Sequence, residues 1–266
     1  MLNNGKVEDG KRSPLRNSPL RAPGESSSSA LNEMILQKVG FWVLFPLVFV
    51  LVALHELMYR YLGTRSSPWF WVVLAVITAA FSFLRIRRLY KTTRPLVLGV
   101  EGERAVGQEL EGLRADGYQV FHDIVCKKAG RQFNIDHVVI GPGGIFTIET
   151  KTISKSGNSK VRYDGQSVTV NGHVPDRDPI EQAQAQRRWL KDMLKESSGK
   201  QFPIRPVVVY PGWYVNEGPA DCEVWVLNDK RLFSYVHHEP KVLERPDVHL
   251  AAYHLAQYVR SPNTPG

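Results

Sequence analysis

Three side chains able to bind a metal ion or move a proton lie in one apolar segment. Residues 135–151 read IDHVVIGPGGIFTIETK and carry Asp136, Glu149 and Lys151 among β-branched and aromatic residues. This composition predicts two strands joined by a tight Gly/Pro turn. Because an unpaired charge is costly to bury, the three groups must either lie at a solvated edge or take part in chemistry.

The turn decides which of these side chains face each other. A two-residue loop at Pro142–Gly143 puts Asp136 opposite Glu149. A loop at Gly143–Gly144 instead puts Asp136 opposite Lys151. Either loop keeps all three on one face, because side chains alternate with a period of two, whereas an odd-length loop would separate them. Opposed residues have Cβ atoms about 5 Å apart, close enough for two carboxylates to share a divalent cation.

These residue types suit metal-assisted hydrolysis. Neighbouring carboxylates repel each other unless a cation or a proton lies between them. Mg²⁺ and Mn²⁺ take hard oxygen ligands, often one or two carboxylates completed by water and phosphate oxygens, so Asp136 and Glu149 are candidate metal ligands. A bound ion would lower the pKa of an attacking water, and Lys151 would orient that water or neutralise developing charge. The structural alternative is a Glu149–Lys151 ion pair on a sheet surface.

A helix expected over 99–117 carries a further carboxylate. Glu103 shares its apolar stripe with Val106, Leu110 and Leu113, so it lies toward the core rather than on the wet face. The alternative is that Glu103 is a first-turn carboxylate stabilised by the helix dipole.

A second helix, expected over 178–197, begins with Asp178 as its cap and Pro179 in its first turn. Its apolar face, which includes Trp189, also carries Gln182 and Gln186. These two glutamines belong either to the site or to a solvated rim.

The pattern from about residue 97 onward is that of a mixed α/β domain. Apolar and β-branched runs predict strands separated by turn residues, and a closing helix is expected over 245–261. The predicted strands cover 118–125, 132–141, 144–152, 160–164, 167–172, 204–212 and 222–228.

The N-terminal third has a different composition. Residues 1–34 are rich in Ser, Pro, Gly and charge, which predicts a disordered tail. Residues 35–94 predict a transmembrane helical hairpin with spans at about 39–61 and 68–86, because each run is long and apolar enough to cross about 30 Å of hydrocarbon. The alternative is a pair of buried helices in a soluble core.

Basic residues flank the hairpin at both ends, whereas the short loop between the spans carries only Arg60 and Arg65. The positive-inside rule therefore predicts a multi-pass protein of the inner, cytoplasmic membrane with its N-terminus and its C-terminal domain in the cytoplasm. The net charge of +8 and pI of about 9.5 fit a phosphate-bearing partner, either nucleic acid or an anionic membrane surface. Two cysteines, Cys126 and Cys222, match neither a disulfide framework nor a zinc site.

Three segments taken in order resemble one known family. GVEGERAVGQEL, FNIDHVVIGPGGIFTIETK and DPIEQAQAQ are similar to the NERD (nuclease-related) domain, which is placed within the PD-(D/E)XK nuclease-like fold. The resemblance covers about residues 98–212. It implies an α/β fold with an αβββαβ core, a mixed sheet flanked by helices. We expect the domain to extend over 95–236 and to be followed by a C-terminal helix and tail over 237–266, beyond the part that the resemblance covers. The residues that it assigns to the site are Glu103, Asp136, Glu149, Lys151 and Gln182.

The resemblance implies a Mg²⁺- or Mn²⁺-dependent nuclease acting on nucleic acid, with DNA favoured as substrate. A membrane-tethered binding or scaffold module that keeps the fold without turnover is the alternative, since fold alone does not fix function. Basic side chains suited to phosphate contacts are Lys127, Lys128, Arg131, Arg187 and Arg188.

Overall fold

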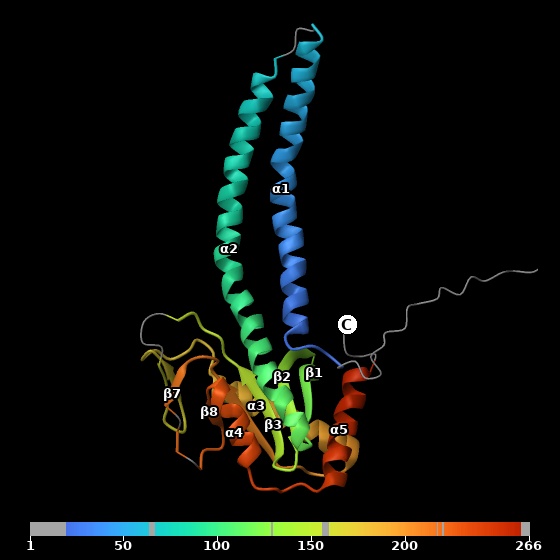
Figure 1. The fold of residues 1–266 in the computed structure, drawn as a ribbon, viewed down its shortest axis with the longest axis vertical. Coiled ribbons are helices and arrows are strands. Elements are labelled where there is room, and N and C mark those ends of the chain that lie inside the picture. Colours follow the sequence, from blue (N-terminus) through green and yellow to red (C-terminus); the bar gives the residue numbers. More distant parts are fainter. Residues whose placement is uncertain are drawn as a thin grey trace, which may run out of the picture.

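The protein is an α/β domain on which a long helical hairpin stands (Figure 1). The structure, a computed structural model, describes residues 20–63, 67–128, 130–155, 160–216, 218–219 and 221–261. The hairpin consists of α1 (Glu25–Tyr61) and α2 (Trp69–Glu111), and the last turns of α2 enter the domain.

Both hairpin helices are long and apolar enough to cross a membrane, judged by length and composition. Their apolar side chains face outward: Leu44, Leu51, Val76 and Phe83 are each more than half exposed. The two helices are therefore not buried in the core of the domain, which was the alternative prediction. An exposed apolar surface of this extent needs to be covered by lipid or protein.

The N-terminal helix begins earlier than the sequence suggested. A disordered tail was expected up to residue 34, but α1 starts at Glu25. The reason is a contact distant in sequence: the backbone N–H of Ser26 donates to the Asp123 carboxylate of the domain at 2.9 Å. Asp123 thus caps the start of α1 from another element, which composition alone does not reveal. The remainder of the expected tail, residues 1–19, lies outside the described residues.

The second apolar span and the first helix of the domain are one continuous helix. A span at about 68–86 and a separate helix over 99–117 were predicted from the sequence. In the structure α2 runs through Pro95 for 43 residues. The candidate span and the helix that carries Glu103 are therefore joined without a linker.

The domain is built on a five-stranded mixed sheet with the order β1-β2-β3-β6-β8. β1 (Gln119–Lys128), β2 (Arg131–Gly141) and β3 (Gly144–Thr150) are antiparallel neighbours. β6 (Ile204–Val209) and β8 (Trp225–Leu227) continue parallel to β3. A small second sheet contains β4 (Lys160–Tyr163), β5 (Val168–Val170) and β7 (Tyr214–Asn216).

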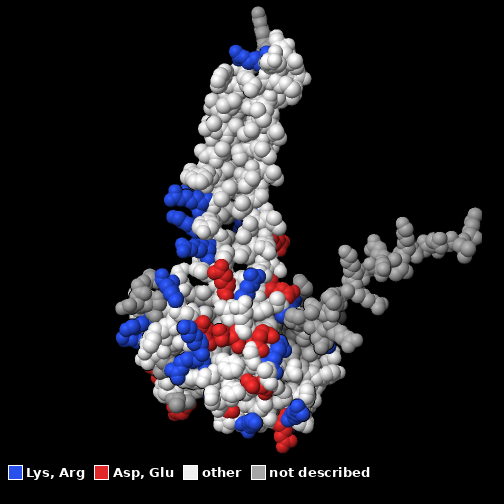
Figure 2. Space-filling view, viewed as in Figure 1, with Lys and Arg blue, Asp and Glu red and all other residues white. Residues whose placement is uncertain are grey.

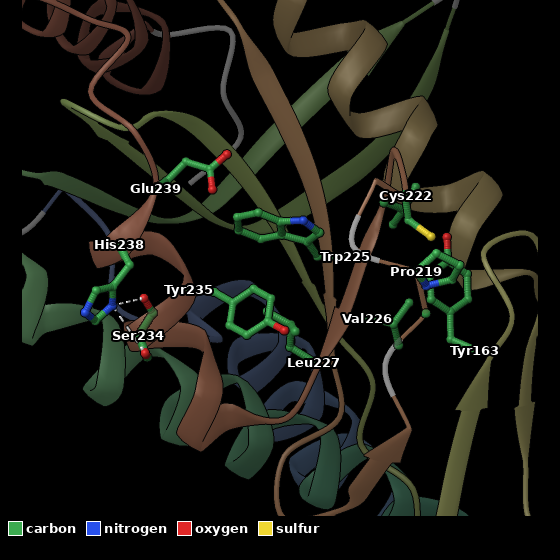
Figure 3. A pocket seen from close by; sticks show the side chains of 12 residues that line it. Tyr163, Pro219, Cys222, Trp225, Val226, Leu227, Ser234, Tyr235, His238 and Glu239 are labelled. Carbon is green, nitrogen blue, oxygen red and sulfur yellow. Dashed lines mark hydrogen bonds between the residues drawn. The ribbon is translucent and has the colours of Figure 1, made fainter.

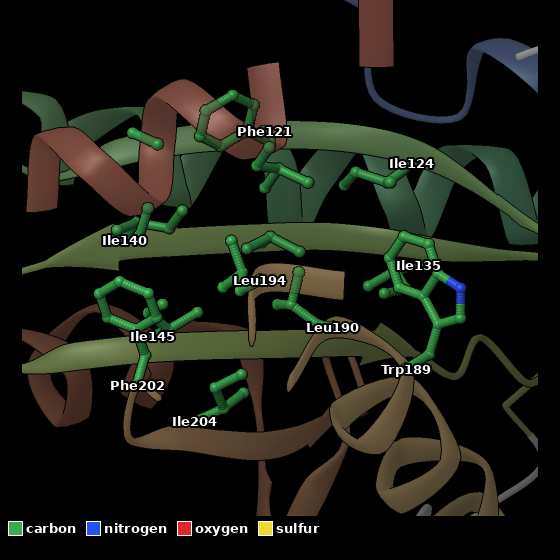
Figure 4. Packing of buried hydrophobic residues seen from close by; sticks show 14 of the residues in the cluster. Phe121, Ile124, Ile135, Ile140, Ile145, Trp189, Leu190, Leu194, Phe202 and Ile204 are labelled. Carbon is green, nitrogen blue, oxygen red and sulfur yellow. The ribbon is translucent and has the colours of Figure 1, made fainter. Parts of the chain in front are cut away.

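Helices cover both faces of the main sheet. On one face, α3 (Pro179–Ser198) and α5 (Arg245–Arg260) pack against strand residues such as Ile140 and Ile145, with Leu190 of α3 wholly buried (Figure 4). On the other face, the end of α2 packs beside α4 (Asp229–His238). A short 3-10 turn, η1 (Gly112–Asp116), follows α2 and leads into β1. The expected α/β fold with an αβββαβ core is confirmed: α2, three strands, α3 and β6 follow in that order.

Two elements were not expected. β7 is only three residues long, which is too short for an alternation of apolar and polar residues to be recognised in the sequence. α4 lies where no helix was predicted, and His237 and His238 are in its last turn. Its buried residues Leu232 and Val236 are spaced four apart, and a single pair of this spacing is too little to reveal a helical period in the sequence.

Candidate active site

The β2–β3 hairpin places Asp136 and Glu149 opposite each other on neighbouring strands. Its register pairs Gly141 with Gly144 and His137 with Ile148, which is the register of a Pro142–Gly143 loop. Gly141 has to lack a side chain, because a Cβ there would lie 2.0 Å from the Tyr118 ring. The same register extended by one residue places Asp136 opposite Glu149.

Glu149 is the most enclosed carboxylate of this group, with 4% of its surface exposed. Its Oε1 accepts hydrogen bonds from Lys151 Nζ at 2.7 Å and from Gln182 Nε2 at 2.6 Å. Lys151 Nζ also donates to Gln182 Oε1 at 2.8 Å. An ion pair between Glu149 and Lys151 therefore exists; its carboxylate is buried between the sheet and α3, and its ammonium is partly exposed.

Gln186 also binds Glu149, although the sequence left open whether it belongs to the site or to a solvated rim. It is 1% exposed, and its Nε2 donates to Glu149 Oε2 at 2.5 Å and to the Asn134 carbonyl at 3.1 Å. A glutamine one turn before Trp189 on the apolar face of a helix was the available signal. Gln186 joins α3, β2 and β3 through one amide.

Asp136 lies beside this network and is partly exposed. Its Oδ2 accepts the backbone N–H of Thr150 at 2.7 Å. Burial, and next to it the negative charges of Glu149 and Glu103, raise the pKa of Asp136 well above its usual value. A carboxylate in this situation is stabilised by any cation that comes between it and its neighbours.

Glu103 reaches the same place from α2. The stripe that it was expected to share is buried at Val106, Leu110 and Leu113, so the stripe directs Glu103 inward as predicted. Burial, followed by the nearby charge of Asp123, raises the pKa of Glu103 to about 7; Glu149 adds to the effect and a hydrogen bond from Ser27 opposes it. Glu103 therefore changes protonation state near neutral pH.

Asp123 is a further acidic residue that the sequence did not single out. It interrupts β1 with a positive φ of 51° and is 2% exposed. Arg21 pairs with it at 3.2 Å, and Asn134 Nδ2 donates to it at 3.1 Å. Both the amide and the hydroxyl of Ser26 donate to it as well. Asp123 thus fastens the start of α1 next to Glu103, a role visible only in three dimensions.

The donor set can be tested for a metal ion. Within the described residues, no group of three or more His, Cys, Asp or Glu side chains is placed to enclose an ion. Mg²⁺, however, needs only one or two carboxylates when water and substrate phosphates complete its shell. Asp136 and Glu149 fit that smaller requirement, and burial together with the charges of Glu149 and Glu103 raises the pKa of Asp136, an effect that a bound cation would oppose.

The five basic residues expected to contact phosphates do not form one uniform surface. Lys128 pairs with Asp192 at 3.0 Å, and Arg187 pairs with Glu223. Arg131 and Arg188 are exposed. The carbonyl of Lys127 accepts a hydrogen bond from the Trp189 indole at 3.3 Å.

A separate pocket of about 370 Å³ lies at the β8 edge of the sheet (Figure 3). Trp225, Tyr235 and Tyr163 line it together with Cys222, a free thiol. None of the candidate site residues lines this pocket. On the face seen in Figure 2, acidic side chains gather instead on the domain just below the hairpin.

Comparison with known proteins gives one match. Residues 98–211 match the family model described as nuclease-related domain, NERD. The match covers α2 from Leu98 through β6, and so includes every residue of the carboxylate group described above except Ser26, Ser27 and Arg21. No curated protein and no solved structure matches the chain.

The raised pKa of Glu103 predicts a pH-dependent cost to stability. Its pKa rises from 4.5 to about 7 on folding, so the folded state holds the proton more tightly and loses stability as pH rises between these values. Glu103→Gln should therefore stabilise the full chain by up to about 3 kcal/mol above pH 7 and much less below pH 5. Thermal unfolding in metal-free buffer across this range measures the difference. Glu181→Gln, on the exposed side of α3, is the control, and a pH-independent effect of Glu103→Gln would contradict the assignment.

Proposed function

We propose that this chain, whose residues 98–211 match the family model of the nuclease-related domain, is a membrane-anchored, divalent-metal-dependent nuclease that hydrolyses phosphodiester bonds. One observation carries the proposal: three carboxylates, from α2, β2 and β3, converge beside a partly buried lysine, Lys151. A purely structural role does not explain why Asp136 and Glu103 should be kept where their ionised forms are disfavoured.

The residues of the chain would divide the work as follows. Asp136 and Glu149 would hold Mg²⁺ or Mn²⁺, which when bound supplies an activated water and neutralises charge on the scissile phosphate. Gln182 and Gln186 fix the Glu149 carboxylate, while the Thr150 amide fixes Asp136. This support keeps both groups in one geometry before substrate arrives.

Two residues would handle protons and charge. Lys151, held by Glu149 and Gln182, would orient the attacking water and offset negative charge that develops on the phosphate. Glu103, with a pKa of about 7, can accept or donate a proton at the pH of the cytoplasm.

The proposed substrate is nucleic acid, with DNA favoured. Lys127, Lys128, Arg131, Arg187 and Arg188 would contact phosphates, the part of binding that does not depend on sequence. The ion pairs of Lys128 and Arg187 would have to open or be shared for those two to contribute.

The hairpin would anchor the enzyme in the inner membrane, with the domain and both termini in the cytoplasm. Its exposed apolar length and the charges that flank it support this arrangement. Protease added outside intact spheroplasts should then leave the domain undigested, and digestion of the domain would contradict the orientation.

A second candidate function is a membrane-tethered nucleic-acid-binding or scaffold module without turnover. The observation in its favour is that both oxygens of Glu149 already have donors, from Lys151, Gln182 and Gln186, without a metal ion. The two functions differ in whether a folded wild-type chain cuts its substrate.

Cleavage by the purified full chain tests the proposal. Labelled single- and double-stranded DNA and RNA would be incubated with Mg²⁺, Mn²⁺ or EDTA. Asp136→Asn and Lys151→Met should each lower the cleavage rate by about 100-fold or more, because each removes a group that acts in the transition state. The exposed residues Asp176 and Lys195 provide matched controls as Asp176→Asn and Lys195→Met. A folded wild-type chain that binds nucleic acid but does not cut it would support the binding module.

The phosphate contacts are tested by the salt dependence of binding. Arg131→Gln combined with Arg188→Gln should make the negative slope of log binding constant against log salt concentration less steep by about 2 for duplex DNA, since each phosphate contact contributes about 0.9. The full chain would be titrated with labelled duplex in EDTA to prevent cleavage. Lys195→Gln combined with Lys241→Gln removes the same charge elsewhere, and an equal change in slope for both pairs would refute a specific contact surface.

A further inference from the structure

The middle of α2 carries a cluster of basic side chains that the proposed active site does not use. We call Arg87, Arg88, Lys91 and Arg94 the basic stripe; all four are exposed. No Asp or Glu occurs anywhere between Glu56 and Glu101. The charge of the stripe is therefore not neutralised by neighbours on its own helix.

The basic stripe faces away from α1. Arg87, Lys91 and Arg94 follow i, i+4, i+7 spacing and so share one side of the helix. The residues of α2 that are buried in the hairpin, Thr78 and Ser82, lie about half a turn away from that side. Figure 2 shows basic side chains projecting from one side of the hairpin between its apolar part and the domain.

The depth of the basic stripe matches the edge of a bilayer. Trp42 and Tyr61 of α1 are about 28 Å apart along the helix axis, close to the thickness of the hydrocarbon core. The Arg85 guanidinium lies 5.6 Å from the Trp42 ring centroid, so it marks the inner boundary on α2. Arg87 to Lys91 then lie about 3 to 9 Å beyond Arg85, at the depth of lipid headgroups.

The position of Glu103 separates the stripe from the catalytic group. Glu103 lies about 14 to 24 Å beyond the basic stripe along α2. It lies about 120° to 180° around the helix from Arg87, Lys91 and Arg94, and about 60° from Arg88. A nucleic acid strand bound along Arg87, Lys91 and Arg94 would therefore run on a different side of the helix from the carboxylates. This favours lipid phosphates over substrate phosphates as the ligand.

We propose that the basic stripe binds the phosphate groups of anionic lipids in the cytoplasmic leaflet and so fixes the height of the domain beneath the membrane. The inference rests on the membrane insertion in the proposed function, but not on nuclease activity. Each basic side chain close to an anionic leaflet favours binding by about fivefold, so four together give a strong preference over zwitterionic lipid.

Lipid selection by the full chain tests this inference. The chain would be reconstituted into liposomes of equal phosphatidylglycerol and phosphatidylcholine and then extracted in mild detergent, and the bound lipids counted by mass spectrometry. Wild type should retain excess phosphatidylglycerol. Changing Arg87, Arg88, Lys91 and Arg94 to Gln should lower that excess by about tenfold or more. The control changes Lys160, Lys195, Lys230 and Lys241 to Gln, four exposed residues of the domain, and should keep it.

Three results would overturn the inference. An equal lipid ratio for wild type and the stripe variant would remove its basis. If the stripe variant instead loses affinity for a single-stranded oligonucleotide in phosphatidylcholine nanodiscs, with its lipid ratio unchanged, then the stripe binds substrate. Release of the wild-type chain from membranes by alkaline carbonate would show that the hairpin is not inserted; the cleavage assay then decides separately whether the nuclease proposal survives.

Discussion

The structure of the site depends on how the buried Glu149 carboxylate is held. An ionised carboxylate inside a protein is tolerated only when donors surround it. Lys151 directly follows the strand that carries Glu149, whereas Gln182 and Gln186 come from α3, so the network joins the helix to the sheet at one point. Removing either glutamine would leave a buried charge short of a donor, which costs more than the hydrogen bond itself contributes.

This arrangement leaves the neighbouring acids short of positive charge. The Lys151 ammonium donates to Glu149 and Gln182, and no hydrogen bond from it to Asp136 is present among the described residues. Burial first, and then the charges of neighbouring carboxylates, raise the pKa values of Asp136 and Glu103. A divalent ion between these carboxylates would relieve the part of the effect that comes from their mutual repulsion.

Local periodicity was sufficient to predict much of the site. Alternation along β2 and β3 put Asp136, Glu149 and Lys151 on one face, and the apolar stripe of α2 directed Glu103 inward. The Asp178 cap of α3 also appears as predicted, with its side chain accepting from the Ile180 amide.

The features that were missed all depend on contacts between distant segments. Asp123 acquires its role only because Arg21 and Ser26 fold back onto β1. The continuity of α2 through Pro95 was also missed, since the second span and the helix over 99–117 were predicted as separate elements. As a result, the helix that would cross the membrane also carries Glu103, so one continuous helix joins the hairpin to the site.

Binding of a divalent ion at Asp136 is the most direct test of this account. Thermal unfolding of the full chain in detergent would be followed while Mn²⁺ is added, since an ion that binds only the folded state raises the unfolding temperature. The account predicts a rise that saturates with Mn²⁺ for wild type and for the exposed-site control Asp176→Asn, and that is lost in Asp136→Asn. No rise in wild type, or an equal rise in Asp136→Asn, would contradict it.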